Sequence, residues 1–236
     1  MDRRDTANLA GSVAVGAWAA FAVLTAVVVG RQGVPLWPDG GLLHWSVGHR
    51  PVVAQAVARG VTDTGTGVVP YVLVLLCGVA VGRDARHRLT LSLLGLACLT
   101  AGQALRYGVM TLVHRHRPAG VDWAAHASGW SFPSGHTTTS AITAGLLIAA
   151  VSLRAPRGTP LLRIAIGCWA AAVGLSRVYL GVHWLTDVLG GWLLATGWLA
   201  VCLWAAAHWL PASVLSGTAP TNRDPAEDHA SQDPGR

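Results

Sequence analysis

The sequence predicts an all-α, polytopic membrane protein: a bundle of six transmembrane helices with a short interfacial helix between spans one and two. Two observations support this prediction. The 236-residue chain is 52% hydrophobic and only 12% charged, with a mean hydropathy of +0.46, whereas soluble domains are typically about 25% charged. The chain also contains six apolar runs of roughly 17 to 25 residues, the length that a helix needs to cross a bilayer.

The six apolar runs occupy most of residues 9–210. They are Leu9–Val29, Thr66–Val81, Leu89–Val113, His136–Leu153, Leu161–Val178 and Trp184–Trp209. The first run is too long for the apolar core of a signal peptide and lacks a convincing cleavage site, so we interpret it as a retained span. The second run is short and contains Pro70, which makes its ends the hardest to place.

The segments outside the spans complete the predicted domain organisation. An amphipathic stretch from Leu42 to Val61 is expected to form a helix at the membrane interface. Residues 211–236 are rich in Pro, Asp, Ser and Asn and poor in apolar residues, which is typical of disorder. We therefore expect a cytoplasmic N-terminus (1–8), a membrane domain (9–210) and a disordered cytoplasmic tail.

The basic residues predict the orientation. All 17 are arginine, and cytoplasmic segments of membrane proteins carry an excess of such residues. With the N-terminus inside, ten arginines fall in inner segments, six in outer segments and Arg106 within a span. We expect an integral cell (inner) membrane protein with both termini cytoplasmic and residues 114–136 on the extracytoplasmic face. The net charge of +6 then reflects topology rather than a nucleic-acid partner.

Three polar clusters lie at the outer ends of spans three to five. They are Arg117-Pro118, Pro133-Ser134-Gly135-His136, and Ser176-Arg177 with His183 and Asp187 following. Arginines on one face bind a multi-oxygen anion such as phosphate. Backbone N–H groups at the helix N-terminus after Ser134 and Gly135 offer a second anion contact.

The histidines of these clusters can perform phosphoryl transfer. His183 and Asp187 are four residues apart and share a face if the segment is helical. A carboxylate that accepts from one ring nitrogen leaves the other nitrogen free to attack phosphorus. His136 can protonate a leaving oxygen and later deprotonate water. These parts together predict a phosphohistidine mechanism.

Acidic residues are too scarce to indicate a metal site. The chain has eleven, and we place only Asp39, Asp63, Asp122 and Asp187 on the outer face, without clustering in sequence. Metal-dependent phosphatases need several carboxylates to hold their ions. We therefore expect no metal and no cofactor, with arginines stabilising the charge of the phosphate.

The three clusters resemble the signature of the type 2 phosphatidic acid phosphatase (PAP2) superfamily, in its integral-membrane lipid phosphatase branch. That signature is Lys-x6-Arg-Pro, Pro-Ser-Gly-His and Ser-Arg-x5-His-x3-Asp, in this order, and the resemblance covers about residues 60–205. It implies that His183 is the nucleophile, Asp187 its orienting partner and His136 the general acid. It also implies that phosphate is bound by Arg117, Arg177, Ser134 and Gly135.

One signature position departs from the family. Met110 stands where the family has its lysine, and the chain contains no lysine. Arg106 lies one helical turn earlier, and a charged residue inside a span is a functional candidate by default. We hypothesise that Arg106 reaches into the phosphate site; the alternative is that it snorkels or hydrogen-bonds a neighbouring helix. The alternatives that follow from the missing lysine are a weakened enzyme and a phosphotransferase.

We make less specific predictions for several residues near the clusters. Arg115 is interpreted as either a headgroup or topology arginine or a ligand. Trp123, Trp130 and Phe132 are expected to anchor the loop at the membrane interface.

The predicted function is metal-independent hydrolysis of a lipid phosphate or pyrophosphate. Undecaprenyl pyrophosphate is preferred by fold-level analogy, with phosphatidate and phosphatidylglycerol phosphate as alternatives. The competing functions are a lipid phosphotransferase that uses the same phosphohistidine, and a non-catalytic protein that binds anionic lipids. The expected partners are the lipid substrate and membrane lipids, and the oligomeric state is open.

Overall fold

A computed structural model of the chain describes residues 2–155 and 159–210, and regular structure in these residues is helical throughout, which confirms the all-α prediction. The predicted disordered tail, 211–236, lies outside the described residues. The helices within the described ranges are α1 (Arg3–Gly30), α2 (Trp37–Gly48), α3 (Val52–Asp63), α4 (Val68–Val81), α5 (Ala85–Val113), the 3-10 helix η1 (Gly120–Asp122), α6 (Gly135–Arg154), α7 (Pro160–Tyr179) and α8 (Leu185–Trp209).

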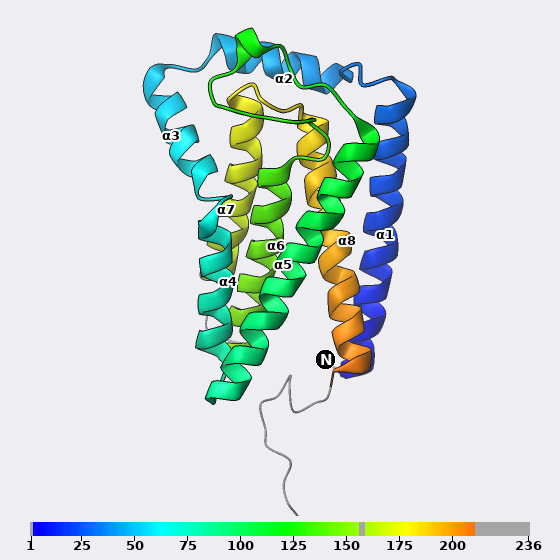
Figure 1. Cartoon of the computed structure of the whole chain (residues 1–236), viewed down its shortest axis with the longest axis vertical. Helices are drawn as coiled ribbons and strands as arrows, with labels where there is room; N and C mark the ends of the chain where they lie inside the picture. The colour runs from blue at the N-terminus through cyan, green and yellow to red at the C-terminus, as the bar shows by residue number, and fades with distance from the viewer. Residues whose placement is uncertain (1, 156–158, 211–236) are drawn as a thin grey trace, which may run out of the picture.

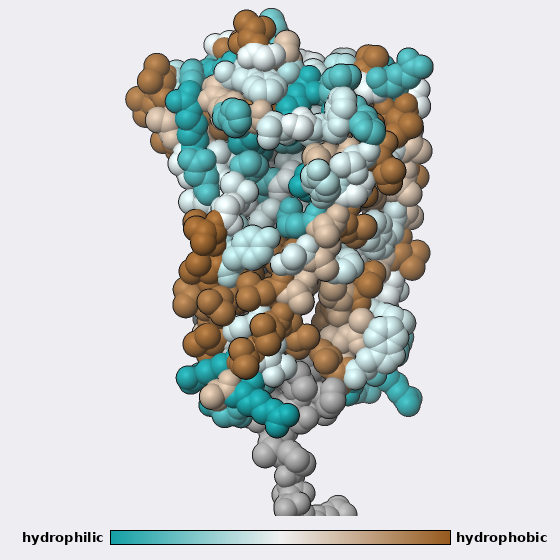
Figure 2. Space-filling view, in the orientation of Figure 1, coloured by the Kyte–Doolittle hydropathy of each residue, from teal (hydrophilic) through white to brown (hydrophobic). Residues whose placement is uncertain are grey.

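The long helices run side by side, and α2 lies across one end of the bundle (Figure 1). The N-terminus and the end of α8 lie at the opposite end, and α1 packs along α8. This arrangement puts the start of α1 and the end of α8 at the same end of the bundle; which end is cytoplasmic stays a prediction. Figure 2 shows apolar side chains on the flanks of the bundle and hydrophilic ones at both ends.

Among the described residues, five helices, α1, α5, α6, α7 and α8, are long and apolar enough to cross a membrane. The remaining predicted span, Thr66–Val81, corresponds to α4, which passes the same test only together with α3, and the two helices meet at an angle of 49°. Gly67 lies in the break with a φ of +65°, a conformation that glycine adopts at little cost. Pro70 falls in the first turn of α4, where its missing N–H removes no helical hydrogen bond.

The prediction of a single interfacial helix over Leu42–Val61 is wrong in detail. The structure has two helices there, with α2 ending at Gly48 and α3 beginning at Val52. Pro51 explains the break, because the residue before a proline is disfavoured in the α conformation. Only α2 lies across the end of the bundle, whereas α3 turns down and packs against α7.

Glycines on α8 allow Phe132 and the first turn of α6 to lie close against that helix. A Cβ at Gly190 would be 2.5 Å from the Phe132 ring, and one at Gly191 would be 3.0 Å from Thr137. Phe132 is fully buried and stacks on Phe21 with ring centroids 5.9 Å apart. The expected interfacial role of Phe132 is therefore wrong, since its ring fixes the start of α6 from inside the bundle.

Candidate active site

The three sequence clusters meet near the end of the bundle that carries α2. The loop between α5 and α6 brings Arg117, the first turn of α6 brings His136, and the last turn of α7 brings Arg177. The turn between α7 and α8 brings His183, and Asp187 follows in the first turn of α8. Elements spread over seventy residues of sequence thus converge on one site.

His183 and Asp187 form a buried pair. The Nδ1 atom of His183 lies 3.3 Å from Oδ2 of Asp187, and the histidine is 2% exposed. The same Oδ2 accepts the main-chain N–H of Trp184 at 2.9 Å, at the start of α8. The two residues therefore meet through helix capping, because His183 precedes α8, and not through a shared helical face as the spacing suggested.

Arg117 holds the loop against the His183 turn. Its Nη1 lies 2.8 Å from Nε2 of His183 and donates to the Val182 carbonyl, also at 2.8 Å. Its remaining hydrogen bonds go to the main-chain carbonyls of Ser128, Gly129 and Trp130 at 2.8–3.1 Å. A guanidinium has five N–H donors, so each has an acceptor here. A phosphate oxygen would bind Arg117 by replacing one of these acceptors.

Arg177 and Arg106, in contrast, retain unused donors. The Nε atom of each is buried without a hydrogen-bond partner among the described residues. Arg177 is 2% exposed and donates from Nη1 to the Thr62 hydroxyl at 3.2 Å. Buried polar groups normally have partners, so these two side chains are candidates for donors to a bound anion.

Arg106 lies against the start of α6. Its Nη1 is 3.1 Å from the sulfur of Met110, and its guanidinium carbon would be 3.5 Å from a Cβ at Gly135. The side chain therefore extends along α5 toward the Pro-Ser-Gly-His segment from one turn deeper than the family lysine position. This placement supports the phosphate-site hypothesis over snorkelling.

The N-terminus of α6 presents main-chain donors next to these arginines. The Ser134 N–H donates to the Asp187 carbonyl at 3.0 Å, and the Ser134 hydroxyl accepts from Thr137 at 2.9 Å. Ser134 makes no side-chain cap of its own helix, so the first N–H groups of α6 have no intrahelical acceptor. Such a helix start favours an anion.

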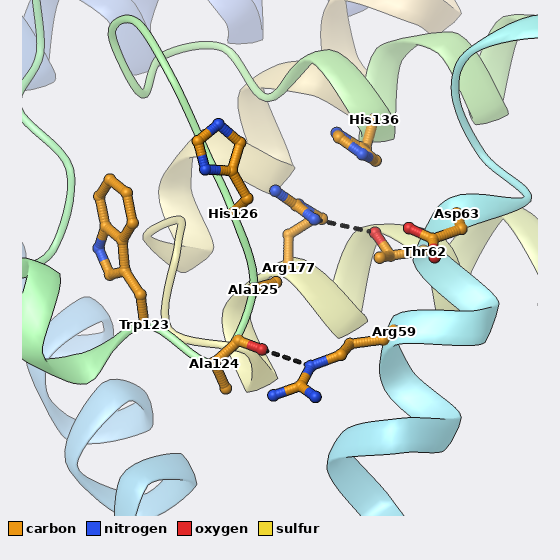
Figure 3. Close-up of a pocket in the computed structure, with 9 residues that line it drawn as sticks. All are labelled: Arg59, Thr62, Asp63, Trp123, Ala124, Ala125, His126, His136 and Arg177. Carbon is orange, nitrogen blue, oxygen red and sulfur yellow. Dashed lines mark hydrogen bonds between the residues drawn. The ribbon is translucent and has the colours of Figure 1, made fainter.

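A cavity of about 480 Å3 opens beside His136 and Arg177 (Figure 3). Its other walls come from α3, with Arg59 and Asp63, and from residues 123–126 of the α5–α6 loop. The sequence motifs did not indicate a contribution from α3. A cavity of this size exceeds the volume of one phosphate and leaves room for a headgroup.

The structure contradicts the headgroup contact expected for Arg115. Its side chain is 0% exposed and forms salt bridges with Asp39 at 2.8 Å and Asp187 at 2.6 Å. It is therefore internal to the protein and contacts no lipid headgroup. Sequence reasoning missed Asp39 because 76 residues separate it from Arg115 and no motif links them.

Comparison with known proteins assigns the class. Residues 111–210 match the PAP2 superfamily. Phosphatidylglycerophosphatase B of Bacillus subtilis (strain 168) is 32% identical over 143 residues, which cover 58% of this chain and 68% of the relative. Lipid A 1-phosphatase of Rhizobium etli is 38% identical over 79 residues, 34% of this chain and 30% of that protein.

A solved structure extends the similarity to most of the fold. The crystal structure of a transmembrane PAP2 type phosphatidylglycerolphosphate phosphatase from Bacillus subtilis aligns with a TM-score of 0.70 at 26% identity, covering 80% of this chain and 93% of that one. The fold and the comparisons define an integral-membrane phosphatase. The chain belongs to the PAP2 superfamily.

Proposed function

We propose that the protein hydrolyses a lipid phosphate monoester through a phosphohistidine on His183. One observation carries the mechanism: Nδ1 of buried His183 faces Asp187, while its Nε2 faces Arg117 at 2.8 Å. When Nδ1 carries the proton and donates it to Asp187, Nε2 keeps its lone pair. A phosphate oxygen can then replace Nε2 as the acceptor of the Arg117 N–H. The phosphorus atom then approaches the freed lone pair, with the phosphate charge balanced by Arg177 and Arg106.

The reaction proceeds in two balanced steps. In the first, Nε2 of His183 forms a bond to phosphorus, the bond from phosphorus to the lipid oxygen breaks, and His136 gives that oxygen a proton. In the second, His136 takes a proton from water, whose oxygen attacks phosphorus and releases inorganic phosphate from His183. His136 suits both roles because it lines the cavity beside Arg177.

Phosphatidylglycerol phosphate is the substrate we favour, ahead of the undecaprenyl pyrophosphate preferred from sequence alone. Support comes from the phosphatidylglycerophosphatase relative, which is matched over two thirds of its length. The cavity adds a physical reason, since the Asp63 carboxylate lies in its wall with Arg177. A carboxylate there can accept hydrogen bonds from a hydroxylated headgroup.

The substrate is tested with purified protein and phosphatidylglycerol phosphate, phosphatidate and undecaprenyl pyrophosphate, each with and without EDTA. We expect phosphate release to be fastest from phosphatidylglycerol phosphate and unchanged by EDTA. Faster release from undecaprenyl pyrophosphate would reverse the ranking, and loss of release in EDTA would contradict the metal-free mechanism. Phosphate that appears on a new alcohol would identify a phosphotransferase.

The pH dependence should reflect a neutral nucleophile. Burial lowers the pKa of His183 to about 4; the hydrogen bond to Asp187 opposes this shift, and Arg117 adds to it. Because the neutral ring attacks, protonation of His183 should cause no loss of kcat/KM from pH 7 to about 5 and a fall of about tenfold per pH unit below about 4. An ordinary histidine would lose activity below about 6.5.

The same shift affects stability. The unfolded chain binds a proton at His183 between about pH 6.5 and 4 while the folded chain does not, so stability decreases as pH falls through this window. Rates are therefore compared only where tryptophan fluorescence reports folded protein. An acid inflection near pH 6.5 that does not move in an Asp187→Asn variant would contradict the assignment to His183.

A further inference from the structure

We propose that Asp39 and Arg115, bridged by the Thr186 hydroxyl, form a positioning unit through which α2 fixes the carboxylate of Asp187 and thereby the ring of His183. The inference rests on the proposed function, in which His183 is the nucleophile. It assigns a role in the reaction to a helix outside the signature motifs.

The two oxygens of Asp187 serve different partners. Oδ2 faces His183 and the Trp184 N–H, at 3.3 and 2.9 Å. Oδ1 accepts from Nη1 of Arg115 at 2.6 Å. Arg115 thus holds the carboxylate through the oxygen that does not face the histidine, and its own side chain is 0% exposed. Its effect on the reaction must pass through Asp187.

Asp39 in turn holds Arg115. Its Oδ2 lies 2.8 Å from Nη2 of Arg115 and 2.7 Å from the Thr186 hydroxyl, and its Oδ1 accepts the Thr186 N–H at 2.9 Å. The Thr186 hydroxyl also accepts from Nη1 of Arg115 at 2.6 Å. Asp39 further accepts the Leu36 N–H at 3.1 Å, which caps α2. One carboxylate therefore fixes α2, Arg115 and the start of α8 together.

The charges of this positioning unit should affect the chemical step as well as the packing. The side chains of Asp39, Arg115 and Asp187 are all 0% exposed, so their charges act on one another with little screening by water. Without Asp39, the full charge of Arg115 would oppose the field of Asp187 at His183. That field stabilises the ring when it gains positive charge on phosphorylation. Loss of Asp39 should therefore slow the chemical step and leave binding of the lipid intact.

The test is an Asp39→Asn variant, which keeps the shape of the side chain and removes its charge. We expect kcat to fall about 10- to 100-fold, as for other groups that orient a catalytic ligand, with KM changed less than about twofold. The matched control is Asp84→Asn. Asp84 also caps a helix, accepting the His87 N–H at 2.9 Å at the start of α5, far from the site. Asp84 is exposed and asparagine caps a helix about as well as aspartate, so this variant should keep both its thermal stability and its kcat.

A second pair of variants decides the question if Asp39→Asn does not fold. Thr186→Val removes the bridging hydroxyl and should lower kcat, whereas Thr186→Ser, which keeps it, should retain most of the turnover that Thr186→Val loses. Unchanged kcat in Asp39→Asn, an equal loss in Asp84→Asn, or equal turnover of the two Thr186 variants would overturn the proposal. Absence of turnover in the wild-type protein would instead overturn the proposed function.

Discussion

A His183→Ala variant should show no turnover above the uncatalysed background, while still inserting in the membrane and folding. The expected loss is on the order of 10⁴-fold or more, because removal of a nucleophile from a concerted set of catalytic groups removes the effect of the whole set. His183 is the histidine whose ring is fixed between Asp187 and Arg117. Phosphate release from phosphatidylglycerol phosphate measures this loss.

The same variant tests the covalent intermediate. Wild-type protein mixed with radiolabelled substrate and quenched in base should carry label on the protein, because a phosphohistidine survives alkaline conditions, and His183→Ala should carry none. His44→Ala is the matched control, since His44 is exposed on α2 at the same end of the bundle and should retain both label and turnover. Turnover without label in rapidly quenched wild-type protein would favour direct attack by water on the substrate.

The sequence predicted those features of the protein that depend on residues close together in the chain. Apolar length predicted the spans, and the motif spacing predicted that His183 and Asp187 would meet. The spacing did not predict how they meet, because the contact depends on where α8 begins. A capping carboxylate at the third residue of a helix and a helical i, i+4 pair leave the same signature in sequence.

Contacts between distant elements were not predictable in this way. Asp39 and Arg115 look like two ordinary polar residues near a membrane surface until α2 is folded over the start of α8. Phe132 looks like an interfacial aromatic until the glycines of α8 bring that helix close to its ring. In each case the contact joins two positions far apart in the chain. A single sequence does not predict such a contact when no motif links the two positions.

Arg106→Ala should lower kcat/KM about 100-fold, the typical cost of removing one donor to a developing anion. The physical reason is the cost of a partly buried guanidinium inside a span. Among the described residues no salt bridge involves Arg106, and its Nε has no hydrogen-bond partner there. We expect the phosphate of the substrate to supply the negative charge that offsets this cost. Arg86→Ala, at the exposed first turn of the same helix, is the control and should leave turnover unchanged.

The double variant Arg106→Ala with Met110→Lys separates catalysis from packing. Met110 is buried, and its sulfur lies 3.1 Å from the Arg106 guanidinium, so a lysine at this position can place its ammonium where the guanidinium was. We expect the double variant to recover at least about tenfold of the lost kcat/KM, whereas Met110→Lys alone brings two cations together and should lower activity. Near-wild-type turnover of Arg106→Ala would mean that Arg106 only snorkels. A loss that the lysine does not restore would mean that Arg106 supports the start of α6 and contributes no charge to the phosphate site.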